Sequence, residues 1–182
     1  MRRQTEEEDN KYKGRLRVSI SACRNLLKSG SAFRGHNESV DSVHRGNFIE
    51  LIKTIGEHSE DIFNNTLDKA PKNNQVICSK SQKEIAKCFA QEILLTIRED
   101  MGEDVFSLLV DESSDVSKKE QMAICLRYVD RLGYVKERFV GLVHVKDTSS
   151  MTLKTAILEI LTSLKLSCSK VIILYFLFEF IF

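Results

Sequence analysis

The segment Val105–Val145 carries the strongest structural signal in the chain and reads VFSLLVDESSDVSKKEQMAICLRYVDRLGYVKERFVGLVHV. It opens with a short continuous apolar run, Val105–Val110, which is typical of a buried central strand. Apolar and polar residues then alternate over 121–128, which predicts a second strand. A short turn with a glycine follows at 131–133, so we expect a third strand over 134–145 to pair antiparallel with the second.

Helical patterns flank these strands on both sides. Apolar residues recurring every three or four positions predict helices over about 11–28, from residue 47, near 60–67, over 79–101 and after residue 148. Two of these helices begin with a predicted capping box, formed by Asn47 with Glu50 and by Ser79 with Gln82. The last helix has candidate caps in Thr148, Ser149 and Ser150.

The element order predicts an α+β fold. N-terminal helices precede a β-β-β-α series, which is how a ribonuclease-H-like fold begins, although other α+β folds share this order. We expect a helical lead-in over 1–103, a partial ribonuclease-H-like domain over 104–168 and an apolar tail over 169–182. Within the tail, Val171–Phe176 is a candidate strand.

Neither end of the chain has the pattern of a membrane or secretion signal. The tail is almost wholly apolar but shorter than the roughly 20 residues that a membrane-spanning helix needs. It is therefore expected to be a buried strand, an interfacial segment or sequence outside the fold, and no membrane partner is expected. The N-terminus MRRQTEEEDN lacks the apolar core of a signal peptide.

Charge and cysteine content exclude some classes of site. The formal net charge is +1, which does not point to nucleic acid. A small basic run, Lys11, Lys13, Arg15 and Arg17, favours a solvated helix face over a phosphate site. The five cysteines form no C-x-x-C pair, so a zinc site is not expected. Free thiols fit a reducing compartment, and Cys23, Cys88 and Cys125 fall on predicted apolar faces.

The chemical candidates follow the first strand, in the sequence LLVDESSD. A buried strand that ends at Asp111 can hold a carboxylate rigidly, and nucleases of the two-metal type need clustered carboxylates. The alternative is an ordinary polar turn, in which Asp and Ser side chains satisfy local backbone groups.

Several separated segments resemble one family. SAFRGHNES, RGNFIELIK, FSLLVDESSDVSKKEQMAICLRYVD and ERFVGLVHVKDTSSMTLKTAI are similar to a eukaryotic domain of unknown function. That domain occurs in zinc finger MYM-type protein 1-like and TTF-type zinc-finger proteins, which look like hAT transposases. The resemblance covers roughly residues 20 to 166.

The resemblance implies a ribonuclease-H-like core with a D-D-E carboxylate triad. Asp111 matches the first acid, so it is the predicted catalytic and metal-binding residue, and Mg²⁺ or Mn²⁺ would be the metal of an active family member. Glu112, Ser113 and Asp115 belong to the same motif and receive no catalytic role. Arg34, Gly35 and His36 match the family's F-R-G-H segment, for which a loop that packs against the core is the preferred interpretation.

The chain also departs from the family pattern. The place of the second acid reads CSKVIILYFLFEFIF, whose only acid, Glu179, matches nothing, and the third acid is absent. We therefore expect a fragment of a transposase-derived protein, truncated near Ser169, with no cofactor and no activity of its own. The alternative is a domesticated nuclear module that binds protein or DNA, with DNA contacts supplied by missing regions. No small-molecule substrate is expected, and the location is the nucleus by resemblance or the cytosol otherwise.

Overall fold

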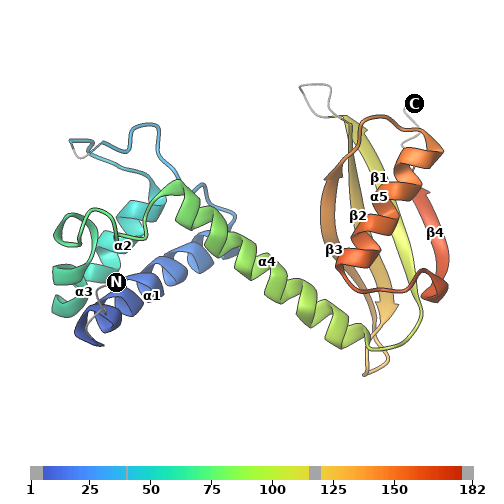
Figure 1. Ribbon diagram of the computed structural model, residues 1–182, viewed down its shortest axis with the longest axis horizontal. Coiled ribbons are helices and arrows are strands. Elements are labelled where there is room, and N and C mark those ends of the chain that lie inside the picture. Colours follow the sequence, from blue (N-terminus) through green and yellow to red (C-terminus); the bar gives the residue numbers. More distant parts are fainter. Residues whose placement is uncertain (1–5, 40, 115–119, 178–182) are drawn as a thin grey trace. The chain divides into compact units, whose positions relative to one another are not determined.

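The computed structural model describes residues 6–39, 41–114 and 120–177 (Figure 1). The chain divides into two compact units, Met1–Gln91 and Glu92–Phe182. This division falls inside a single helix, α4 (Ser79–Met101). The sequence-based boundary at residues 103 and 104 lies just beyond that helix and stays a prediction about domain organisation.

The first unit is helical. It contains α1 (Glu6–Ser29), α2 (Asn47–Glu57), α3 (Glu60–Asn65), a 3-10 turn at Leu67–Lys69 and the first part of α4. Apolar residues at helical spacing face one another and form a core, because burying them removes their surface from water. The fully or nearly buried members of this core are Val18, Ala22, Cys23, Leu26, Phe48, Ile49, Ile52 and Ile85.

Helix α2 begins differently from the prediction. Gly46, not Asn47, is the N-cap, with φ 101° and ψ 153°, and no side chain caps the helix. The Asn47 side-chain amide instead donates to the Ala32 carbonyl at 2.9 Å. Glu50 Oε1 accepts the backbone N–H of Arg45 at 3.0 Å. The predicted capping box at Asn47 is wrong because the chain enters the helix in a backbone conformation that is essentially restricted to glycine.

The predicted capping box of α4 is also absent. Ser79 already lies inside the helix. The side chain of Gln82 donates back to the Ile77 carbonyl at 2.8 Å, so it contacts the segment before the helix.

The second unit holds a mixed four-stranded sheet, which establishes the α+β class. Its elements after α4 are β1 (Phe106–Ser114), β2 (Glu120–Val129), β3 (Val135–His144), α5 (Ser150–Ser163), a 3-10 turn at Cys168–Lys170 and β4 (Val171–Leu177). The strand order is β3-β2-β1-β4. β1 pairs antiparallel with β2 and parallel with β4, so α5 is a crossover connection, as the sequence predicted.

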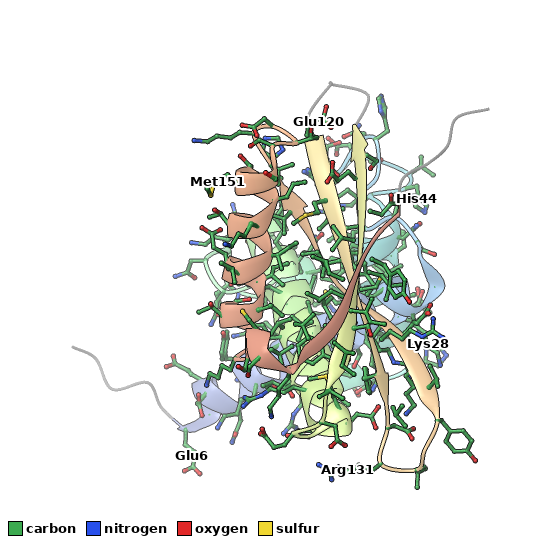
Figure 2. The ribbon with its side chains drawn as sticks, turned by 90° about the vertical axis from the view of Figure 1, so that its right-hand side faces the viewer. Glu6, Lys28, His44, Glu120, Arg131 and Met151 are labelled. Carbon is green, nitrogen blue, oxygen red and sulfur yellow. The ribbon has the colours of Figure 1, made fainter. Side chains whose placement is uncertain are left out.

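One face of this sheet is buried under α5. Alternate residues of β1 and β2 enter a core with Leu153, Ala156, Ile157 and Leu161 of α5. Figure 2 shows α5, which carries Met151, lying along one side of the strands. The helix begins at its predicted cap, since Ser149 Oγ accepts the Thr152 N–H at 3.4 Å.

The opposite face carries exposed apolar side chains. Phe139 and Leu142 of β3 are 59% and 56% exposed. Ile173 and Tyr175 of β4 are 42% and 48% exposed. The sheet thus has one covered and one open apolar face in the described part of the chain.

Strand β1 is longer than the sequence indicated. It continues through Asp111, Glu112 and Ser113 to Ser114, each of which pairs with a residue of β2. The alternative of a polar turn starting at Asp111 is therefore wrong, because the backbone of this segment pairs with β2 as part of the sheet. Asp111 lies inside the strand, three positions before its last residue. Asp115 lies outside the described residues.

Polar contacts join the β2–β3 hairpin to the end of α4. Lys136 Nζ contacts Asp130 Oδ2 at 2.7 Å and Asp100 Oδ2 at 3.0 Å. The Tyr128 hydroxyl donates to the same Asp100 oxygen at 2.9 Å. Asp130 Oδ1 also accepts two backbone N–H groups of the turn, those of Leu132 and Tyr134. The turn predicted at 131–133 is thus organised by a carboxylate.

The cysteines meet their predictions only in part. Cys23 is buried and Cys125 half-buried, but Cys88 is exposed, so its predicted place on an apolar face is wrong.

Among the residues that the structure describes, no helix combines the length and apolar character needed to cross a bilayer.

Candidate functional site

Asp111 occupies an inner strand of the sheet. Its Cα pairs with Ala123 on β2 and with Leu177 on β4. The residue is half-buried. Pairing with a strand on each side holds the backbone of Asp111 in place, and a functional carboxylate needs such a rigid support.

Strand alternation separates Asp111 from Glu112. Successive side chains of a strand point to opposite faces of the sheet. Leu108 and Val110 are buried in the core beneath α5, and Glu112 continues that series toward the same face. Asp111 therefore points to the open face, away from α5.

Glu112 lies at the rim of a cavity between α5 and the strands. The cavity has a volume of about 670 Å³, and its lining is mostly apolar, with Leu153, Ile157 and Leu174 among its residues. Burial, followed by the nearby carboxylates of Glu120 and Asp111, raises the pKa of Glu112. The Glu112 carboxyl is thus destabilised in its charged form.

Among the described residues of the open face, the thiol of Cys125 lies close enough to Asp111 to be affected by its charge. Burial raises the pKa of Cys125, and the carboxylates of Glu137 and Asp111 raise it further. Glu137 is itself engaged with Arg127, 3.4 Å away. Asp111 therefore shares this face with one thiol and with an acid that already has a cationic partner.

The described residues do not fit a two-metal centre. A pair of divalent ions about 3.5–4 Å apart needs several carboxylates around them. Asp111 supplies one, Glu112 projects to the other face, and no group of three or more His, Cys, Asp or Glu side chains gathers among the residues described. At the register position of Asp111, β4 carries Leu177. The acids Asp115 and Glu179 lie outside the described residues.

The F-R-G-H segment has a packing role in the helical unit. A Cβ atom on Gly35 would lie 2.7 Å from the backbone nitrogen of Gly46, so the two glycines cross backbone to backbone. Phe33 stacks on Phe48 with ring centroids 6.1 Å apart, and the Phe48 N–H donates to the Phe33 carbonyl. This geometry supports the preferred interpretation of a loop that packs against the core.

The charged members of the segment lie at the surface of that loop. The Arg34 guanidinium pairs with Glu38 at 2.6 Å, and this contact lowers the pKa of the Glu38 carboxyl. His36 is exposed.

The basic run of α1 contains a residue that the sequence interpretation missed. Lys11, Lys13 and Arg17 are not buried, but Arg15 is only 5% exposed. Helical spacing alone could have placed Arg15 with the apolar series of Val18, Ala22 and Leu26, which lie three to four residues apart on the buried side. The prediction of a wholly solvated face is therefore wrong at Arg15.

The observed fold is compatible with a ribonuclease-like domain. A three-stranded meander, a crossover helix and a fourth strand parallel to the first, with an acid on the first strand, are features of ribonuclease-like domains. The chain belongs to the family described as the ZMYM1/FAM200 RNase-like domain (DUF4371), which matches residues 1–173. No solved structure matches the chain.

Proposed function

We propose that this chain is a ribonuclease-like piece of an hAT-transposase-derived protein that does not cleave DNA by itself. The observation that carries the proposal is the donor set around Asp111, where no cluster of metal-binding side chains gathers among the described residues and the β4 register partner is Leu177. One carboxylate cannot hold two divalent ions, and groups that act as a unit lose most of their rate when members are missing.

A nuclease assay tests this proposal. The purified chain is incubated with supercoiled plasmid and with short duplexes in Mg²⁺ or Mn²⁺, beside an Asp111→Ala variant and a Glu112→Gln control. We expect no metal-dependent cleavage above the level of Asp111→Ala. Cleavage by the wild-type chain and by Glu112→Gln that disappears in Asp111→Ala would overturn the proposal.

A second candidate function is a nuclear module that binds another protein. It is favoured by the open face of the sheet, where Phe139 and Leu142 expose more than half of their surface beside the half-buried Asp111. Apolar surface with a single acid suits a partner that presents an apolar face and one basic group. DNA is the less favoured ligand of this face, because strong nonspecific binding needs many cationic contacts to phosphates.

Variants on the two faces test the second candidate. In cells, the tagged chain is expected in the nucleus with a discrete cross-linked partner. A Leu142→Glu change on the open face should remove that partner, whereas Met151→Glu on α5, at a residue that is also well exposed, should retain it. If both variants retain the protein partner equally, this candidate is wrong. It is also wrong if the chain binds no protein partner and instead binds DNA in a salt-sensitive manner.

A further inference from the structure

A buried arginine in the helical unit has a side-chain N–H without a hydrogen-bond partner. Arg15 of α1 is only 5% exposed, and its Nε atom is enclosed without an acceptor among the described residues. An arginine side chain stays charged and carries five N–H donors, so enclosing one of them without an acceptor is costly. Buried polar groups in folded proteins are almost always satisfied, and an exception calls for a specific explanation such as an absent anion.

Arg15 lines a cavity whose charge balance favours an anion. The cavity measures about 690 Å³ and lies among α1, the 3-10 turn after α3 and the loop that follows. Its charged lining residues in the described chain are Lys11, Arg15, Lys69 and Glu8, which is three cations against one carboxylate. The remaining polar lining comes from asparagine amides, including Asn73 and Asn74.

The other two cations of the cavity already have partners. Lys11 Nζ lies 2.6 Å from Glu7 Oε1. Lys69 Nζ donates to Asn64 Oδ1 at 3.1 Å and sits 3.5 Å from the centre of the Phe63 ring. Arg15 is therefore the lining cation that has a side-chain N–H without an acceptor among the described residues.

We propose that this cavity binds a phosphate group, with Arg15 as its main ligand. A guanidinium presents a planar fork of donors that matches phosphate oxygens, and the amides of Asn73 and Asn74 add neutral donors. The cavity is larger than one phosphate, so it has room for the nucleoside of a free nucleotide or for part of a nucleic-acid backbone. This site lies in the helical unit, shares no residue with the Asp111 site and goes beyond the function proposed above.

The side-chain N–H of Arg15 provides a direct test in the wild-type chain. A ¹⁵N-labelled sample is titrated with inorganic phosphate at constant ionic strength, and the arginine Nε–Hε signals are followed by NMR. The Arg15 signal should shift until it saturates. The signal of Arg17, which lies on the same helix but is exposed, should not shift. An Arg15 signal that stays in place, or that moves equally with chloride, overturns the proposal.

A matched pair of variants separates binding from folding. Phosphate at about 100 times Kd should raise the Tm of the wild-type chain and of Arg17→Met by about 5 to 10 °C. Arg15→Met should show no such rise, and its Tm without phosphate should equal or exceed that of the wild type because the enclosed donor without an acceptor is gone. A phosphate-dependent rise that persists in Arg15→Met refutes the assignment. Should this variant not fold, the NMR titration of the wild-type chain still decides.

Two further ligands identify the source of the phosphate. A deoxynucleoside monophosphate and a single-stranded oligonucleotide are each added while the Arg15 signal is observed. Stronger binding of the monophosphate supports a free nucleotide, and stronger binding of the oligonucleotide supports a nucleic-acid backbone. If both ligands bind without moving the Arg15 signal, the site does not take phosphate.

Discussion

Replacing glycine by alanine should have opposite effects at Gly46, which contacts Gly35, and at Gly14, which has open space around it. A Cβ atom on Gly46 would lie 2.2 Å from the backbone nitrogen of Gly35, which no real structure tolerates without a shift of the backbone. Gly14, in the middle of α1, has nothing within 4 Å of the position that an alanine methyl group would take. Gly46→Ala should therefore destabilise the helical unit, and Gly14→Ala should stabilise it.

The magnitude follows from two contributions at Gly46. Its φ of 101° and ψ of 153° lie in a region that is essentially restricted to glycine, which costs other residues about 1–3 kcal/mol. Overpacking at a close contact costs about 1–3 kcal/mol more. The loss expected for Gly46→Ala is therefore about 2–6 kcal/mol in the free energy of unfolding. Gly14→Ala should gain about 0.5–1 kcal/mol, because alanine is the better helix former.

Native-state hydrogen exchange measures these effects in the unit concerned. The Phe48 N–H donates to the Phe33 carbonyl at 3.0 Å, so its exchange reports the opening of this loop from the core. Protection of Phe48 should fall in Gly46→Ala and persist or rise in Gly14→Ala. If Gly46→Ala changed the opening free energy by less than about 0.5 kcal/mol, the close approach of the two glycines could not constrain the fold as described.

Two other predictions concern titratable groups. Hydrogen bonds from Lys136 and then from the Tyr134 backbone lower the pKa of Asp130, so its stabilising effect is present above the unfolded value, near pH 4, and is lost as the pH falls through the lower folded pKa. Asp130→Asn should therefore be less stable at pH 7 and show a flatter acid dependence in urea unfolding; an unchanged acid slope would contradict this. Burial raises the pKa of Cys23 to about 11, whereas hydrogen bonds from Ser81 lower the pKa of Cys78, which is exposed. Alkylation of the native chain at pH 8, read by mass spectrometry, should modify Cys78 first, and early labelling of Cys23 would count against its burial.

Regular elements were predictable where the apolar period was sustained. The strands at 121–128 and 134–145 and the helix after Ser149 carry clear alternation or helical spacing, and the structure confirms them. The order of elements also indicated the α+β class, because a meander followed by an amphipathic helix leaves few ways to bury one face of a sheet.

The errors occur where long-range contacts override local signals. Asp111–Ser114 has the composition of a turn, but pairing with β2 extends the strand through it. Asn47 has the residue type of a cap, but the crossing of Gly46 with Gly35 determines where α2 begins. Neither partner is visible within a local window of sequence.

The candidate site was predictable in kind but not in surroundings. The position of Asp111 after an apolar run indicated a strand-borne carboxylate, and strand alternation alone separates it from Glu112. Helical spacing could have indicated the burial of Arg15, but the cavity that it lines also needs the 3-10 turn and loop that follow α3, roughly fifty residues further along the chain. The approach of that distant segment has no local signature, so the sequence could not reveal the cavity.

Helix α4 sets a rule for dissecting the chain in the laboratory. Its first half supplies Ile85 to the helical core, while Ile97 and Met101 belong to the core beneath α5. A cut at the division between Gln91 and Glu92 would leave each half with a helix too short to form well in water. Two expression fragments should therefore overlap, each retaining the whole of Ser79–Met101. In each fragment, the half of α4 that belongs to the other core would remain as solvent-exposed helix.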